Sequence, residues 1–144
     1  MARVLGIDVG ERRVGLAVSD PTGTLARPLA TLTVTGAGDA VTQVRGEIER
    51  LSAEEDGLAS IVVGVPSRLD GSASDGTARV EAFIQLLAGH TTLPIARGDE
   101  RLTSREAESR LALRESNWRR RKQKLDAAAA ALILQDHLDR RRSA

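Results

Sequence analysis

Carboxylate side chains stand at the ends of segments that the sequence predicts to meet in the fold. Asp8 lies within the aliphatic run of residues 4–9, where a charge is costly to bury unless it is paired or bound to a metal. Asp99 and Glu100 follow another short aliphatic segment, and Asp126 opens an alanine-rich helix. In open α/β sheets, binding sites lie beyond the carboxyl ends of the parallel strands. We therefore expect these acids to form one cluster.

The chemistry expected of such a cluster is metal-dependent hydrolysis. Neighbouring carboxylates oppose each other's ionisation, and a hard cation resolves that conflict. Ligands that are all oxygens suit Mg²⁺ or Mn²⁺ rather than zinc. Two such ions about 4 Å apart can activate a water on one side of a phosphodiester and stabilise the leaving oxygen on the other. The candidate catalytic and metal-binding residues are Asp8, Glu100 and Asp126, with Asp99 as an alternative ligand.

Each of these acids also has a purely structural interpretation. Asp8 could be a turn residue that ends a strand, and Asp99 and Glu100 could pair with neighbouring arginines on a surface loop. Asp126 could interact with the dipole at the start of its helix. The helix face that carries Asp126 is otherwise apolar, however, so its carboxylate is expected to point inward with the alanines.

Two glycines near Asp8, two isolated histidines and the lack of cysteine further limit the kinds of site that this chain could form. Gly10 and Gly15 leave the backbone open to the close approach of a phosphate or a metal-bound ligand. His90 and His137 are isolated in the sequence, and there is no cysteine. The isolation of the histidines argues against a catalytic triad and a zinc site, and the lack of cysteine argues against a thiolate site.

The elements that must position the acids alternate along the chain as in a mixed α/β fold. Gly10-Glu11-Arg12 separates two aliphatic runs and predicts a hairpin. The predicted strands are residues 3–9, 13–19, 26–34, 61–65 and 93–97, and the predicted helices are 38–55, 76–89, one that opens at the capping box Thr103–Glu106, and 123–139.

Length and composition predict a single domain, residues 1–144, in a reducing compartment. The chain has 144 residues, the size of one ordinary domain, and its lack of cysteine excludes a disulfide framework. No apolar run is long enough to span a membrane, and the N-terminus shows no targeting signal. We therefore expect a cytoplasmic protein without membrane contact.

The charge distribution predicts a polyanionic partner. Residues 1–100 hold 9 basic and 14 acidic side chains, whereas residues 101–144 hold 12 and 6. Part of the basic excess lies at residues 140–142, within an expected basic C-terminal tail of about 140–144 that could simply be solvated. Trp118 could stack on an unpaired base or cover the last two helices. The candidate nucleic-acid contacts in this region are Trp118, Arg119, Arg120, Arg121, Lys122 and Lys124.

Four motifs in order along the whole chain resemble the YqgF (RuvX) family. They are Gly6-Ile7-Asp8-Val9-Gly10 with residues 13–20, Val63-Gly64-Val65-Pro66 with Asp70-Gly71, residues 99–103, and residues 126–130. The resemblance implies an RNase H-like fold, a five-stranded mixed sheet flanked by helices. It also implies a nuclease, and hence a hydrolase, that acts on Holliday junctions in DNA recombination and repair or on the 5′ end of pre-16S ribosomal RNA in ribosome biogenesis.

The resemblance also implies a set of site residues. It assigns metal binding to Asp8, Glu100 and Asp126, with Asp99 as the adjacent candidate. Related RuvC-type resolvases place an acid at the end of the fourth strand, where this chain has residues 64–66 without a carboxylate. That acid must then come from Glu100 or from Asp70 in the following loop. Arg68, in the same loop, could contact a phosphate.

Two rival functions remain open at the level of sequence. The segments 7–10 and 15–18 also resemble the phosphate-binding hairpin of actin-like ATPases and sugar kinases, but those folds place nucleotide between two domains and this chain supplies one. A noncatalytic nucleic-acid-binding or ribosome-binding module is the second rival. It would gain nothing from a carboxylate cluster when it binds a polyanion. Symmetrical cutting of a four-way junction needs two sites and would predict a homodimer, whereas RNA trimming would not.

Overall fold

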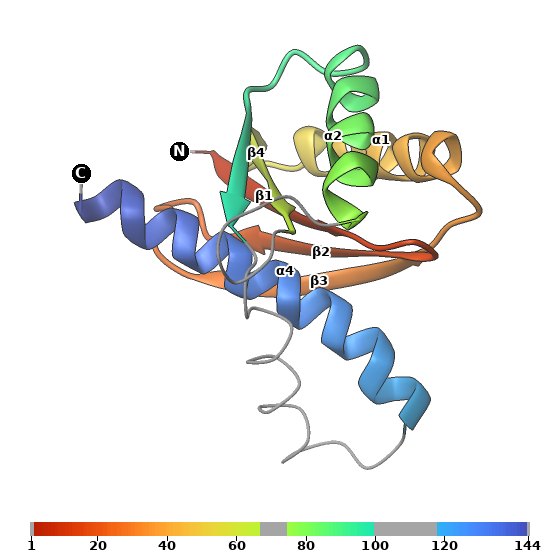
Figure 1. The fold of residues 1–144 in the computed structure, drawn as a ribbon. Helices are drawn as coiled ribbons and strands as arrows, with labels where there is room; N and C mark the ends of the chain where they lie inside the picture. The colour runs from red at the N-terminus through yellow and green to blue at the C-terminus, as the bar shows by residue number, and fades with distance from the viewer. Residues whose placement is uncertain (1, 67–74, 100–117, 144) are drawn as a thin grey trace.

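The fold is a five-stranded mixed sheet with helices on both faces (Figure 1). The computed structural model describes residues 2–66, 75–99 and 118–143, of which residues 75, 99, 118–124 and 143 are described by their backbone alone. The elements are β1 (Arg3–Val9), β2 (Arg13–Ser19), β3 (Ala26–Thr33), α1 (Ala37–Ala53), β4 (Leu58–Val65), α2 (Asp75–Ala88), β5 (Ile95–Asp99) and α4 (Trp118–Ser143). The predicted helix at Thr103–Glu106 lies outside the described residues.

The strands are ordered β3-β2-β1-β4-β5 in the sheet. β1 pairs antiparallel with β2, and β2 pairs antiparallel with β3. β1 and β4, and β4 and β5, are parallel. The predicted hairpin is confirmed, and the amide of Gly10 donates to the carbonyl of Arg13 at 2.8 Å to close its turn. The predicted mixed α/β sheet of five strands is therefore confirmed.

Strand alternation divides the buried side chains between two layers. Leu5, Ile7 and Val9 of β1 pack in the core under α1 and α2, whereas Val4 packs in a second core under α4. The residues of α1 predicted to share a buried face, Val41, Val44, Ile48 and Leu51, are indeed buried in the first of these cores. Helical spacing in the sequence thus identified the face correctly.

Arg3 fixes the connection between α1 and β4. This side chain is only 8% exposed, and its guanidinium donates to the carbonyls of Leu51 and Gly57 at 3.1 and 3.2 Å. It also pairs with Glu54 at 2.9 Å. Gly57 has a φ of +57°, a conformation that glycine adopts at little cost. The start of β1 is thereby tied to the turn that leads into its parallel neighbour.

Helix α4 is longer at both ends than residues 123–139, the range that the sequence predicted. Residues 140–143, expected as a basic tail, continue the helix instead. Arg140 pairs with Asp136 at 3.0 Å, and Arg142 pairs with Asp139 at 2.5 Å and donates to the carbonyl of Thr24 at 3.0 Å. These contacts give the basic residues partners that keep the last turn helical. In the described part of the chain, no helix is long and apolar enough to cross a membrane.

Candidate functional site

The candidate site lies where three parallel strands end. Ile7 of β1 is in register with Val63 of β4, and Val65 of β4 is in register with Asp99 of β5. The carboxyl ends of β1, β4 and β5 therefore share one edge of the sheet. Asp8 is half-buried near the end of β1. The prediction that Asp8 lies near the end of the first strand is confirmed.

Gly15 brings helix α4 to the strand pair that carries Asp8. Gly15 is the cross-strand partner of Asp8. A Cβ built on Gly15 would lie 2.0 Å from the carbonyl oxygen of Asp126 and 3.0 Å from the amide nitrogen of Ala127. The backbone of α4 therefore rests directly on Gly15. Asp8 and Asp126 approach the same glycine from the sheet and from the helix.

The same observation corrects the role expected for Gly10 and Gly15. The close approach at Gly15 is made by the protein's own helix, not by a phosphate or metal-bound ligand. At Gly10 the restriction comes from the hairpin, because a Cβ there would lie 2.8 Å from the carbonyl oxygen of Arg13. Gly6 is a second contact with α4, since its Cβ would lie 2.8 Å from Cβ of Leu134. Gly6 and Gly15 thus help seat α4 on the sheet.

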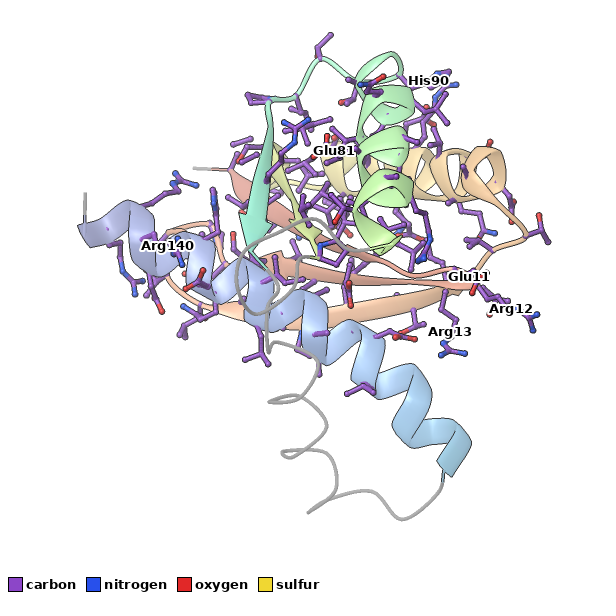
Figure 2. All side chains as sticks on the ribbon, in the orientation of Figure 1. Glu11, Arg12, Arg13, Glu81, His90 and Arg140 are labelled. Carbon is purple, nitrogen blue, oxygen red and sulfur yellow. The ribbon has the colours of Figure 1, made fainter. Side chains whose placement is uncertain are left out.

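Arg13 is a site residue that sequence reasoning did not single out. Its Nε donates to Oδ2 of Asp126 at 2.5 Å, and the two side chains are 33% and 24% exposed. Arg13, Gly15 and Ala17 alternate along β2, so they share the face under α4. Figure 2 shows Arg13 at the hairpin end of the sheet beside α4, with Glu11 and Arg12 at the turn. Strand alternation from Gly15 was the sequence signal that could have identified it.

The other predicted site residues are placed only in part. Asp99 is the last residue of β5. Glu100 and Arg68 lie outside the described residues. The segment from Trp118 to Lys124 forms the first turns of α4, and Figure 1 shows that this end of the helix reaches past the sheet. Within the described ranges, no group of three or more His, Cys, Asp or Glu side chains could hold a metal ion. Of the predicted acids whose side chains the structure describes, Asp8 and Asp126 both lie beside Gly15.

The donor atoms at this edge fit a hard cation. Asp8 and Asp126 offer only oxygen, which Mg²⁺ and Mn²⁺ prefer. His137 follows Asp126 by eleven residues in α4, a rise of roughly 16 Å, so it cannot join the same site. Burial, together with the charge of Arg141, lowers the pKa of His137. His90 lies beyond the end of α2, away from the hairpin (Figure 2).

Sequence comparison gives relatives along the whole chain. The family model described as "RuvX: Holliday junction resolvase" matches residues 2–140. A relative from Pelotomaculum thermopropionicum is 39% identical over 137 residues, which cover 95% of this chain and 86% of the relative. A relative from Salinibacter ruber is 42% identical over 144 residues, which cover 96% and 94%. Both carry the name "Putative pre-16S rRNA nuclease".

Structure comparison gives the same fold. RuvC from Thermus thermophilus, solved in complex with a Holliday junction substrate, matches with a TM-score of 0.62 over 99% of this chain and 97% of RuvC, at 17% sequence identity. A second structure of Thermus thermophilus RuvC matches with a TM-score of 0.56 at 18% identity, over 98% and 96% of the two chains. The expected RNase H-like fold is thereby confirmed. Together with the match over residues 2–140, it establishes that the chain belongs to the RuvX (YqgF) family of nucleases related to Holliday junction resolvases.

Proposed function

We propose that this protein is a metal-dependent endonuclease that hydrolyses phosphodiester bonds in branched or structured nucleic acid. The observation that carries the proposal is the placement of Asp8 and Asp126 around Gly15, at the edge where β1, β4 and β5 end. Two half-buried acids beside one glycine oppose each other's ionisation, and a divalent cation bound there would offset that repulsion. Membership in a nuclease family supports the same chemistry.

The proposed third ligand comes from the C-terminal end of β5, a strand that packs against α4. Ala96 packs in the core under α4, and a Cβ at Gly98 would lie 3.0 Å from Cγ2 of Ile133 in α4. The even-numbered positions of β5 therefore face α4, the side on which Asp126 lies. We therefore keep Glu100, which follows β5 directly in the sequence and lies outside the described residues, as the proposed third ligand, with Asp99 as the alternative.

In the proposed mechanism the protein supplies oxygen ligands at fixed positions, and the metal ions would supply the positive charge that stabilises the reacting groups. When bound, Mg²⁺ or Mn²⁺ ions lower the pKa of an attacking water and stabilise the leaving oxygen, as a two-metal site does. Asp8 is held by the ladder between β1 and β2, and Asp126 is held by the contact of its backbone with Gly15. Both carboxylates therefore start from fixed backbone positions, which lowers the cost of ordering them around the ions.

We propose that the basic start of α4 binds the phosphate backbone. Arg119 precedes Asp126 by seven residues, about 10 Å along the helix axis, so one nucleic-acid strand can reach both. The proposed contacts are Trp118, Arg119, Arg120, Arg121, Lys122 and Lys124, with Arg68 from the segment that follows β4 in the sequence. Contacts of this kind make binding weaker as salt increases.

The test is a cleavage panel that compares the wild type with Asp8→Asn. The substrates are a four-way DNA junction, duplex DNA, single-stranded DNA and a precursor of 16S ribosomal RNA, each with Mg²⁺, with Mn²⁺ or with a chelator. Asp8→Asn should abolish cleavage and leave nucleic-acid binding largely intact, because it removes a ligand and leaves the basic residues in place. Asp56→Asn, at an exposed turn after α1, is the matched control and should cut normally. Unchanged cleavage by Asp8→Asn would refute the proposal.

The same panel decides the substrate and the assembly. Symmetrical cutting of a four-way junction needs two active sites, so a protein that resolves junctions should sediment as a homodimer. A protein that instead cuts the precursor RNA preferentially needs only one active site, so it need not be a dimer. Binding of any of these substrates without metal-dependent cleavage would instead indicate a noncatalytic module.

A further inference from the structure

The ion pair between Arg13 and Asp126 places a cation inside the proposed metal site. It joins the first residue of β2 to α4 across 113 positions of sequence, with Nε and Oδ2 2.5 Å apart. The carbonyl of Arg13 also accepts the hydrogen bond from Gly10 that closes the hairpin turn, so the backbone that carries this guanidinium is held in place. In the described part of the chain, Asp126 is the acid with which Arg13 pairs.

A guanidinium and a divalent ion compete for the same carboxylate. Oδ2 of Asp126 either accepts the hydrogen bond from Nε of Arg13 or coordinates a metal ion, and the two cations repel each other when both are close. Without metal, the arginine neutralises part of the charge that Asp8 and Asp126 bring to the edge. With metal, the same arginine opposes binding. The ion pair between Arg13 and Asp126 therefore stabilises the metal-free protein and weakens the binding of a metal ion.

We propose that Arg13 is an internal counter-ion of the metal site, which a Mg²⁺ or Mn²⁺ ion must displace from Asp126. Arg13 is a positioning residue in this role: it holds Asp126 ready in the metal-free protein and raises the metal concentration that the site needs. The inference rests on the proposed function, because it requires Asp126 to be a metal ligand. It goes beyond that function by assigning Arg13 control of metal affinity.

The size of the effect follows from Coulomb's law. Both side chains are partly exposed, at 33% and 24%, so the dielectric of bulk water gives a lower bound on the repulsion. A divalent ion about 6 Å from the guanidinium is then disfavoured by roughly tenfold in affinity. Replacement of Arg13 by a neutral residue should tighten metal binding by about that factor. A residue with only a structural role would, when removed, weaken metal binding or leave it unchanged.

The experiment is a calorimetric titration of the full chain with Mn²⁺ alone, at fixed ionic strength and without nucleic acid. Arg13→Gln should bind Mn²⁺ about tenfold more tightly than the wild type, and the gap should narrow at high salt, which screens the repulsion. In a chelator, the same variant should melt at a lower temperature, because it loses an ion pair. Arg13→Met keeps the apolar stem without the charge and gives a second test if Arg13→Gln folds poorly.

Two control variants show whether the change in Mn²⁺ binding requires loss of the Arg13 charge itself or follows from loss of any ion pair or nearby charge. Arg97→Gln removes another strand-to-helix pair, in which Arg97 of β5 contacts Glu81 of α2 at 2.8 Å on the other face of the sheet. Arg12→Gln removes a neighbouring exposed charge. Both should bind Mn²⁺ within about twofold of the wild type, since neither touches Asp126.

The outcomes distinguish this inference from the proposed function. Unchanged or weaker Mn²⁺ binding by Arg13→Gln and Arg13→Met, with normal binding by the wild type and loss of binding in Asp126→Asn, overturns the role of Arg13 and leaves the metal site standing. If the wild type takes up no Mn²⁺, or if Asp126→Asn binds it as tightly as the wild type, the metal site itself is refuted and the role of Arg13 with it.

Discussion

Substitution of Gly15 by alanine tests the contact between α4 and the strand pair that carries Asp8. The backbone of Gly15 does not have the positive φ that favours glycine, so an alanine is acceptable there except for what its Cβ would meet. That Cβ would lie 2.0 Å from the carbonyl oxygen and 2.3 Å from the carbonyl carbon of Asp126, where real Cβ atoms come no closer than 3.0 Å. The part of α4 around Asp126 must therefore move outward by about 1 Å.

The cost of this movement can be estimated from the residues that α4 buries. Ala129, Ala130, Ile133, Leu134 and Leu138 pack against the sheet. A gap of about 0.5–1 Å forfeits a quarter to a half of each dispersion contact that it opens. Overpacked cores usually lose about 1–3 kcal/mol, and here the obstacle is backbone, which yields least. We expect the free energy of unfolding to fall by about 2–4 kcal/mol.

Urea unfolding followed by far-ultraviolet circular dichroism measures this loss. With a slope of about 2 kcal/mol/M, the midpoint of Gly15→Ala should fall by about 1–2 M. Its affinity for Mn²⁺ should also fall, because Asp126 moves with the helix and ligand positions tolerate only about 0.5 Å. Gly46→Ala is the matched control: a Cβ there meets nothing within 4 Å. In this exposed position of α1 it should raise stability by about 0.5–1 kcal/mol. A Gly15→Ala protein as stable as the wild type would refute the reasoning.

Two further predictions concern residues outside the site. Arg3→Ala should lower the free energy of unfolding by about 1–3 kcal/mol in the same urea assay, because it removes the side-chain donors to the carbonyls of Leu51 and Gly57 and the ion pair with Glu54, and it should not change Mn²⁺ affinity. Wild-type stability in this variant would contradict the role given to Arg3. Asp20 accepts hydrogen bonds from Thr22 and from loop amides, which lower its pKa from 3.8 to about 2. Because the folded-state pKa is depressed, its stabilisation is present above pH 3.8 and is lost as the pH falls through about 2. The melting temperature of the wild type should therefore exceed that of Asp20→Asn near neutral pH, and a difference that persists unchanged in acid would contradict this account.

Local patterns in the sequence were sufficient for most of the elements. Aliphatic runs separated by Gly10-Glu11-Arg12 predicted the hairpin, and helical spacing predicted the buried face of α1. Both depend on residues close together in the chain, whose periodicity follows from backbone geometry. The ends of α4 were less predictable. Its last turn is stabilised by a contact between Arg142 and Thr24, which no local pattern reveals.

The sequence by itself determined which side chains the candidate site can offer. A carboxylate inside the β1 segment, a second at the alanine-rich helix and the absence of cysteine restrict the candidate site to oxygen ligands and a hard cation. Only the tertiary structure decided what these acids contact. Gly15 receives the backbone of Asp126, and Arg13 pairs with its carboxylate across 113 positions of sequence. Such contacts depend on how closely a helix packs on a sheet, a distance set by all the side chains between them and not by the residues on either side of Asp126.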